Sequence, residues 1–226
     1  MTFTFCDAPQ RSLAWFQARL GRLTGTAAAD MLAKPSTAGY RDLKMRLVVE
    51  RLTGAPQDDD YTNAAMEWGR SHEDEARIEY EMHTGQNVRE SGFLAAIDLL
   101  AGCSLDGHIG DYDGHATFEG ILELKCPYKT AIHVETVRAG IPAKYLPQVR
   151  HNLWISQAQW CDFVSYDPRV PERLRLSVHR AWAKDLDIPD YEKKAKAFLA
   201  ECEAEYRALL TITNPAAVMT EALHGV

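Results

Sequence analysis

Three ionisable residues lie close to the ends of two short apolar segments in the middle of the chain. Glu123 and Lys125 alternate with leucines in the segment 121–125, and Asp106 follows Leu105. Side chains on a strand alternate between faces, so Glu123 and Lys125 would share one face. A buried charge is costly unless it is paired or bound to a cation. The pattern therefore suits a divalent metal beside a phosphate, and it points to phosphodiester hydrolysis.

This chemistry needs a hydroxide in line with the leaving oxygen and positive charge on the oxygens of the transition state. A divalent metal can supply both, and Mg²⁺ prefers hard oxygen ligands. We predict that Asp106 and Glu123 are the metal carboxylates and that Lys125 orients the water or stabilises the attacked phosphate. The alternative is an ordinary Glu-x-Lys pair on an exposed sheet face, which the pair alone does not exclude.

A third acid, Glu73, lies in a segment from 63 to 84 with the period of a helix. It borders an apolar arc on that helix. The arc comprises Trp68, His72, Ala76 and Tyr80. An acid at the border of a buried face can reach a cleft, so Glu73 could join the metal site. The alternative is a solvated helix with Arg70 and Arg77 as partners of Glu73. His72 is expected to be a core histidine with its hydrogen bonds satisfied.

Two further groups of polar residues could contact a substrate. The segment 19–26 places Arg19, small residues and hydroxyls such as Thr26 before a predicted helix. Backbone N–H groups and a guanidinium at such a place suit a phosphate. The alternative, which the segment alone favours slightly, is a capped turn between two helices. Gln148 would direct an amide towards the cleft, or it is an ordinary glutamine on a helix surface.

The hydrophobic periodicity predicts an α/β protein with a mixed central sheet flanked by helices and an N-terminal helical part. Helices are expected over 12–20, from 24 or 26 to 32, and over 40–53, 63–84, 129–138, 142–156 and 191–210. Strands are expected over 88–97, 99–103, 105–109, 117–125, 160–166 and 174–181. A turn is expected at 110–114, and the last dozen residues are expected to be a tail.

Local signals refine some of these helices. Ser12 should cap the first helix, whose apolar face carries Leu13, Phe16 and Leu20. The helix over 40–53 should bury Leu43, Leu47 and Val48. Gly54 and Gly85 are expected just beyond helix C-termini. The helix over 142–156 should either kink or begin at Pro147.

The composition is that of a globular protein and excludes several other classes. The 226 residues are 46% hydrophobic and 25% charged, with a net charge of −7. No apolar run reaches the roughly 18–20 residues that cross a bilayer, and the N-terminus does not resemble a signal peptide. Five cysteines without a C-x-x-C pair predict neither a disulfide framework nor a structural zinc site, and they favour a reducing cytoplasm.

The negative net charge argues against a protein that coats nucleic acid by bulk positive charge. The distribution of charge is nevertheless uneven, because basic residues are concentrated before position 52 and between 125 and 150. Such a distribution could give a positive channel on an acidic body. A solvated mixture of charges is equally compatible with the composition.

Taken in order, several short segments resemble the phage lambda exonuclease family, which belongs to the PD-(D/E)xK nuclease superfamily. The segments are Trp15-x-x-x-Arg19-Leu20-Gly21, Thr24-Gly25-Thr26, Ala33-Lys34-Pro35, Trp68-Gly69, His72-Glu73, Cys103-Ser104-Leu105-Asp106-Gly107, Leu122-Glu123-Leu124-Lys125-Cys126-Pro127, Gln148-Val149 and Tyr166-Asp167-Pro168. They extend over about two thirds of the chain. The string 122–127 and the order of the series are specific, whereas each other piece alone is not.

The resemblance implies a role for each matching position. Asp106 and Glu123 match the metal-binding acids, with the Leu124 carbonyl as a further ligand. Glu73 matches the helix acid near a second metal, and Lys125 matches the catalytic lysine. Gln148 matches the glutamine that closes the superfamily motif. Arg19 and Thr26 match positions that hold a terminal 5′-phosphate.

The resemblance further implies a single nuclease domain over 1–226, with a helical part over 1–62, a catalytic core over 63–182, and a helix and tail over 183–226. It implies a 5′→3′ exonuclease on ends of double-stranded DNA, with two Mg²⁺ ions that Mn²⁺ could replace. A homotrimeric ring and a single-strand annealing recombinase as partner are also implied, in a bacterial cell that carries the phage. The alternatives are an endonuclease with the same core and a non-catalytic DNA-binding module.

Overall fold

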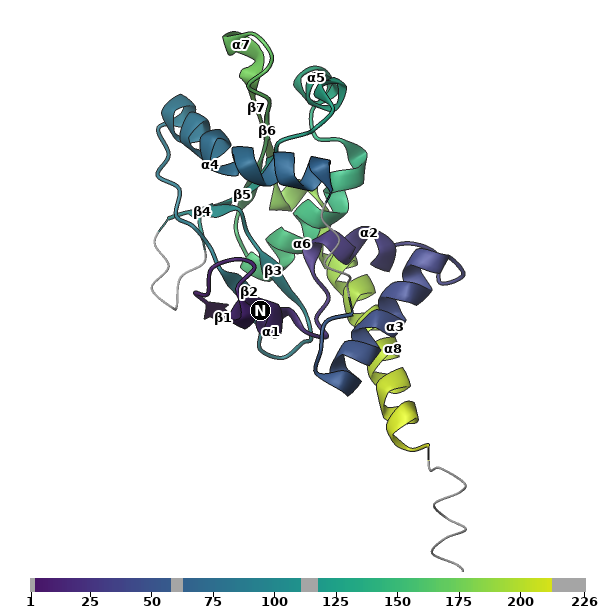
Figure 1. Ribbon diagram of the computed structural model, residues 1–226. Helices are drawn as coiled ribbons and strands as arrows, with labels where there is room; N and C mark the ends of the chain where they lie inside the picture. The colour runs from purple at the N-terminus through teal and green to yellow at the C-terminus, as the bar shows by residue number, and fades with distance from the viewer. Residues whose placement is uncertain (1–2, 58–62, 111–117, 213–226) are drawn as a thin grey trace, which may run out of the picture.

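The computed structural model describes residues 3–57, 63–110 and 118–212, and it has the mixed α/β architecture expected from the sequence (Figure 1). The strands are β1 (Phe3–Cys6), β2 (Phe93–Ala96), β3 (Gly102–Ser104), β4 (Gly107–Ile109), β5 (Gly120–Lys125), β6 (Trp160–Tyr166) and β7 (Leu176–Trp182). The α-helices are α1 (Leu13–Arg19), α2 (Ala28–Met31), α3 (Ala38–Thr53), α4 (Ala64–Thr84), α5 (Thr130–Ala139), α6 (Leu146–Ser156), α7 (Glu172–Arg175) and α8 (Ile188–Leu210). Short 3₁₀ helices are η1 (Gly25–Ala27), η2 (Ala143–Tyr145) and η3 (Ala183–Asp185).

The predicted mixed sheet is formed by four strands in the order β4-β5-β6-β7. Strands β5 and β6 are parallel, with Glu123 opposite Phe163, and the other pairs are antiparallel. Strand β5 therefore lies inside the sheet, with a neighbour along each edge. Two predicted strands, over 88–97 and 99–103, instead contribute β2 and β3 to a second, antiparallel sheet in the order β1-β2-β3.

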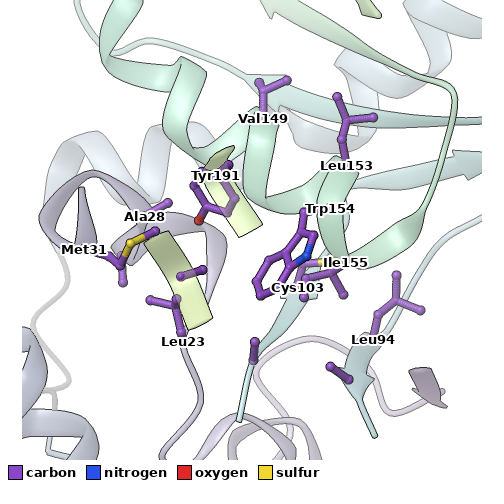
Figure 2. Close-up of a cluster of buried hydrophobic side chains, with 14 of the residues drawn as sticks. Leu23, Ala28, Met31, Leu94, Cys103, Val149, Leu153, Trp154, Ile155 and Tyr191 are labelled. Atoms are coloured by element: carbon purple, nitrogen blue, oxygen red, sulfur yellow. The ribbon is translucent and has the colours of Figure 1, made fainter. Parts of the chain in front are cut away.

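Helix α6 lies in the middle of the largest hydrophobic cluster and connects the sheets to the helical parts (Figure 2). Its Val149, Leu153 and Trp154 are buried together with Cys103 of β3 and Tyr191 of α8. Burial of such large apolar side chains contributes roughly 1.5–3 kcal/mol each. The cluster contains residues from all three predicted parts of the chain, so α6 is held from several sides.

The helix boundaries follow the local signals in the sequence. The Ser12 hydroxyl accepts a hydrogen bond from the Trp15 N–H at 3.3 Å and caps α1. Gly54 and Gly85 follow α3 and α4 with φ of 66° and 69°, a left-handed conformation that glycine adopts without steric cost. Pro147 lies in the first turn of α6, so the helix begins there and does not kink.

Other expectations differ from the structure in ways that distant contacts explain. Strand β1 was not predicted, because it forms only by pairing with β2 some ninety residues later. The apolar face expected on α1 is largely in solvent, with Leu13 74% and Phe16 38% exposed. Trp15 is buried instead, against Phe93 and Ala95 of β2. The expected turn at 110–114 and the tail beyond 212 lie mostly or wholly outside the described residues.

Helices α3 and α8 lie side by side away from the sheets (Figure 1). The predicted inward residues Leu43, Leu47 and Val48 of α3 are buried there. At the edge of this contact, Arg51 donates a hydrogen bond to Glu203 at 2.6 Å. Within the described ranges, no helix has the length and apolar character needed to cross a membrane.

Candidate active site

Strand β5 presents its two faces to different environments. Leu122 and Leu124 pack with Tyr80 of α4 and with Trp160 and Val164 of β6. Glu123 therefore points to the opposite face of the sheet, towards α6, and it is only 1% exposed. The alternation predicted from the sequence is confirmed, and the exposed-face alternative for Glu123 is excluded.

Three donors surround the buried Glu123 carboxylate. Its Oε1 accepts hydrogen bonds from the Lys125 ammonium and from Gln148 Nε2, the latter at 2.6 Å. Its Oε2 accepts a hydrogen bond from Asn152 Nδ2 at 2.9 Å. Gln148 and Asn152 are four residues apart on α6, so they lie on the same face of the helix. Gln148 thus points into the site, not along an outer helix surface.

Asp106 lies between β3 and β4, at the junction of the two sheets. Its Oδ2 accepts a hydrogen bond from the Leu124 N–H at 2.7 Å. Strand β4 begins at Gly107, which is paired with Leu122, so no β4 residue is paired with Leu124. The Asp106 carboxylate accepts the Leu124 N–H in place of a strand carbonyl. This bond fixes one carboxylate directly beside the strand that carries the other.

Glu73 approaches the same region from α4 and lines the cavity there, but its ion-pair partner is not one of the two arginines expected from the sequence. Its Oε2 forms an ion pair with Arg11 Nη2 at 3.8 Å, whereas Arg77 pairs with Asp74 and Glu90. His72 is only partly buried, and its Nδ1 lies 2.8 Å from the Trp68 carbonyl oxygen. Glu73 therefore faces the site, whereas His72 is held by its own helix.

Arg19 is the last residue of α1, and its guanidinium lies over an aromatic ring. The Arg19 Cζ atom lies 4.1 Å from the centroid of the Trp15 ring, and Nη1 donates to the Ser104 hydroxyl at 2.8 Å. Trp15 Nε1 donates to the same hydroxyl at 3.0 Å. Stacking and a shared acceptor hold the guanidinium in one orientation, as recognition of a planar or tetrahedral anion requires.

A cavity of 720 Å³ connects these groups. All eight residues predicted for the site line it: Arg19, Thr26, Glu73, Asp106, Glu123, Leu124, Lys125 and Gln148. Its basic lining residues are Arg11, Arg19, Arg70, Lys125 and Lys129. The cavity therefore combines acids on its sheet side with several cations, although the chain as a whole is negatively charged.

A profile of the YqaJ-like viral recombinase domain matches residues 14–159, more than half of the chain. This chain belongs to the YqaJ-like viral recombinase family. The resemblance to the phage lambda exonuclease family is thereby confirmed.

Two crystal structures of the alkaline exonuclease LHK-Exo from Laribacter hongkongensis, one in complex with dAMP, are similar to this YqaJ-like chain. Each is 36% identical over 88% of this chain and 96% of LHK-Exo, with a TM-score of 0.77. A phage-related exonuclease from Haemophilus somnus 129PT has the same fold, at 12% identity over 84% and 95% of the two chains and a TM-score of 0.61. A comparison with curated proteins finds no match.

Burial and mutual repulsion dominate the electrostatics of this YqaJ-like site. Burial raises the pKa of Glu123, Asp106 and Glu73, and neighbouring acids raise the pKa of Glu123 and Glu73 further. Burial alone would lower the pKa of Lys125, but Glu123 and Asp106 raise it above its ordinary value. Lys125 is therefore a firmly protonated cation, and the three acids would gain from additional positive charge.

The donor set fits a hard divalent cation. Asp106, Glu123, Glu73 and the Leu124 carbonyl offer only oxygen ligands, which Mg²⁺ and Mn²⁺ prefer. With the side chains as they stand, no three His, Cys, Asp or Glu side chains among the described residues form a group that could hold a metal. Two donors bind Glu123 Oε1, whereas Asn152 is the donor to Oε2 among the described residues, so Oε2 keeps a lone pair for a cation.

Sequence reasoning missed two residues that contact the predicted acids. Asn152 is 1% exposed and binds Glu123, and Arg11 pairs with Glu73. The spacing of four from Gln148 could have revealed Asn152, since the two share a helix face. Arg11 has a φ of 69°, which is unusual for a residue other than glycine, and no sequence pattern signals that conformation.

Proposed function

We propose that this protein is a Mg²⁺-dependent 5′→3′ exonuclease. It would degrade one strand of linear double-stranded DNA and leave 3′ single-stranded overhangs for annealing-type recombination. The observation that carries the proposal is the shared cavity, in which Asp106, Glu123 and Lys125 lie with Arg19 and Thr26. The 36% identity to an alkaline exonuclease over most of the chain supports the same chemistry.

Each residue has a defined task in this proposal. Asp106, Glu123 and the Leu124 carbonyl would hold divalent metal, and Glu73 would complete a second metal's environment. Bound metal would lower the pKa of the attacking water and neutralise charge on the phosphate. Lys125 would hold that water or the attacked phosphate oxygen from the same strand face as Glu123.

The direction of digestion follows from the end-binding residues. Arg19 is held by Trp15 and Ser104, and Thr26 is exposed at η1 on the same cavity. A guanidinium and a hydroxyl there suit a terminal 5′-phosphate. Gln148 would donate through its amide to Glu123 and keep that carboxylate in the cavity.

The partners are part of the proposal. The substrate is a double-stranded DNA end, the assembly is a homotrimeric ring, and a single-strand annealing recombinase receives the product. The protein would act in the cytoplasm of a bacterial cell and be encoded by a phage or prophage. The match to a viral recombinase domain supports this setting.

The deciding experiment is digestion of linear duplex DNA labelled separately at each 5′ and 3′ end. We expect release of the 5′ label first, no release without Mg²⁺ or Mn²⁺, and no cutting of a covalently closed circle. Cleavage of the circle would favour the endonuclease alternative. Binding of duplex without any cleavage would favour the non-catalytic module, although that module has no need of Glu73, Asp106, Glu123 and Lys125 in one cavity.

A further inference from the structure

Asn152 is a buried polar residue in the middle of the hydrophobic helix α6. It is 1% exposed, and its neighbours on either side, His151 and Leu153, are buried as well. Its Nδ2 donates to Glu123 Oε2 at 2.9 Å. A buried amide is tolerated when it has a hydrogen-bond partner, and here the partner is a carboxylate of the proposed site.

The other side of the Asn152 amide lies against η1. A Cβ atom added to Gly25 would lie 2.5 Å from Asn152 Oδ1 and 3.2 Å from Gln148 Cγ. No larger residue fits at Gly25 unless the Asn152 side chain moves. Gly25 immediately precedes Thr26, which lines the cavity. The Asn152 amide is thus enclosed between the Glu123 carboxylate and the backbone of the turn that carries Thr26.

This arrangement limits the motion of the carboxylate. Lys125 and Gln148 both bind Oε1, so these two donors alone would allow the carboxylate to pivot about that oxygen. Among the described residues, Asn152 is the donor that binds Oε2, and its hydrogen bond holds the second oxygen of the carboxylate in place. Partners that orient a metal-binding side chain typically change metal affinity or activity by about 10- to 100-fold when removed.

We infer that Asn152 is a positioning residue for Glu123, and that Gly25 holds Asn152 in place. The packing of Gly25 against the amide therefore links the rotation of the carboxylate to the position of η1. Asn152 touches no substrate in this scheme and acts only through Glu123. The inference rests on the proposed function for its catalytic readout, but the geometry that carries it involves protein groups alone.

The first test is Asn152→Ala in the full-length protein, with Mn²⁺ as the metal probe. We expect kcat on linear duplex to fall about 10- to 100-fold, with the KM for DNA within about threefold of wild type. We also expect Mn²⁺ affinity, measured by isothermal titration calorimetry without DNA, to fall about tenfold. A merely structural role would lower the thermal midpoint and leave both quantities unchanged.

The second test approaches the same amide from the other side. Gly25→Ala should displace the Asn152 side chain and lower kcat about tenfold. In the Asn152→Ala background the clashing oxygen is gone and only the 3.2 Å approach to Gln148 Cγ is left, so Gly25→Ala should lower kcat by less than about twofold further. Multiplication of the two single effects in the double variant would show that Gly25 does not act through Asn152, and it would overturn the linkage.

Ser156→Ala is the matched control, because Ser156 is a buried, hydrogen-bonded polar residue at the far end of the same helix. It should alter the thermal midpoint without changing kcat or Mn²⁺ affinity. Unchanged kcat and Mn²⁺ affinity in Asn152→Ala would overturn the positioning role. If wild type cleaves no DNA, the proposed function fails, and the Mn²⁺ titration alone then decides whether Asn152 positions Glu123.

Discussion

Two buried carboxylates on neighbouring strands show how differently one sheet can accommodate negative charge. Glu123 of β5 and Asp162 of β6 are each 1% exposed, and they lie on opposite faces. Asp162 receives two hydrogen bonds from Arg180, both at 2.8 Å, and a third from the Tyr80 hydroxyl at 2.7 Å. The Arg180 guanidinium also stacks 3.6 Å from the Trp160 ring centroid. Asp162 is therefore matched by a single, fully engaged cation.

Glu123 also pairs directly with a cation, Lys125, but the charge of Lys125 acts on a second acid as well. Glu123 shares Lys125 with Asp106, and its other donors, Gln148 and Asn152, are neutral amides. Burial raises the pKa of both Glu123 and Asp106. The comparison teaches that a buried acid with its own cation forms a structural pair that is costly to break, whereas two buried acids that share one cation keep capacity for a further cation and for chemistry.

The largest expected effect comes from removal of Lys125, the cation that hydrogen-bonds Glu123. Lys125→Ala should lower the rate of duplex digestion about 10³-fold, because the positive charge beside the reacting phosphate is lost. DNA and Mn²⁺ binding should be largely intact. Lys129→Ala is the matched control, since Lys129 lines the same cavity but is exposed beyond the end of β5. Full activity of Lys125→Ala would remove this residue from catalysis.

Disruption of the Asp162–Arg180 pair should lower the stability of the fold, not the rate of digestion. Arg180→Ala leaves Asp162 buried without its cation, which should lower the free energy of unfolding by about 3 kcal/mol. This value is the lower end of the usual range, because the Arg180 side chain is 35% exposed. Glu123→Gln should abolish digestion but cost less stability than Arg180→Ala, because one acceptor oxygen is lost while Lys125 keeps Asp106 as a neighbouring acid. Urea titrations of both variants test the contrast, and equal losses of stability would refute it.

Arg19 tests whether the end-binding part of the cavity is distinct from the cutting part. Arg19→Ala should slow digestion of 5′-phosphorylated duplex about tenfold, since a charge-assisted hydrogen bond is lost. Duplex with a 5′-hydroxyl should be affected much less. Initial rates on the two substrates give the ratio. Equal slowing on both would mean that Arg19 does not recognise the phosphate.

The smallest effect concerns pH and a second matched acid, Asp167. Burial would raise its pKa, but hydrogen bonds from Arg169 lower the pKa to about 2. The unfolded value is about 3.9, so this pair stabilises the fold above about pH 4 and the gain is lost as the pH falls towards about 2. Urea titrations across this window should show a shallower loss for Asp167→Asn than for wild type. Parallel curves would show that Asp167 is not the group responsible.

The sequence predicted best what depends on neighbouring residues. Alternation in β5 separated Glu123 and Lys125 from the leucines, and the helical period placed Glu73 beside an arc of which Ala76 and Tyr80 are buried. Capping signals gave the helix ends at Gly54 and Gly85. These features arise from backbone geometry over a few residues, so a single sequence contains them.

The family resemblance brought distant site residues together, but other features that depend on distant pairing were not predicted. The partners Tyr80, Asp162 and Arg180 come from three elements, and nothing local marks them as a group. The exposure of Leu13 and the burial of Trp15 depend on where β2 lies. Sequence patterns fix which side chains share a face, but long-range packing decides which face is buried.

The hydrogen bond between the Leu124 amide and Asp106 has a spectroscopic consequence. This amide proton belongs to an interior strand, yet its acceptor is a side-chain carboxylate and not a strand carbonyl. In a proton–nitrogen NMR spectrum, its chemical shift should report the charge and ligation of Asp106 directly. The Leu124 resonance would thereby follow cation binding at Asp106, without a label in the cavity and without DNA turnover.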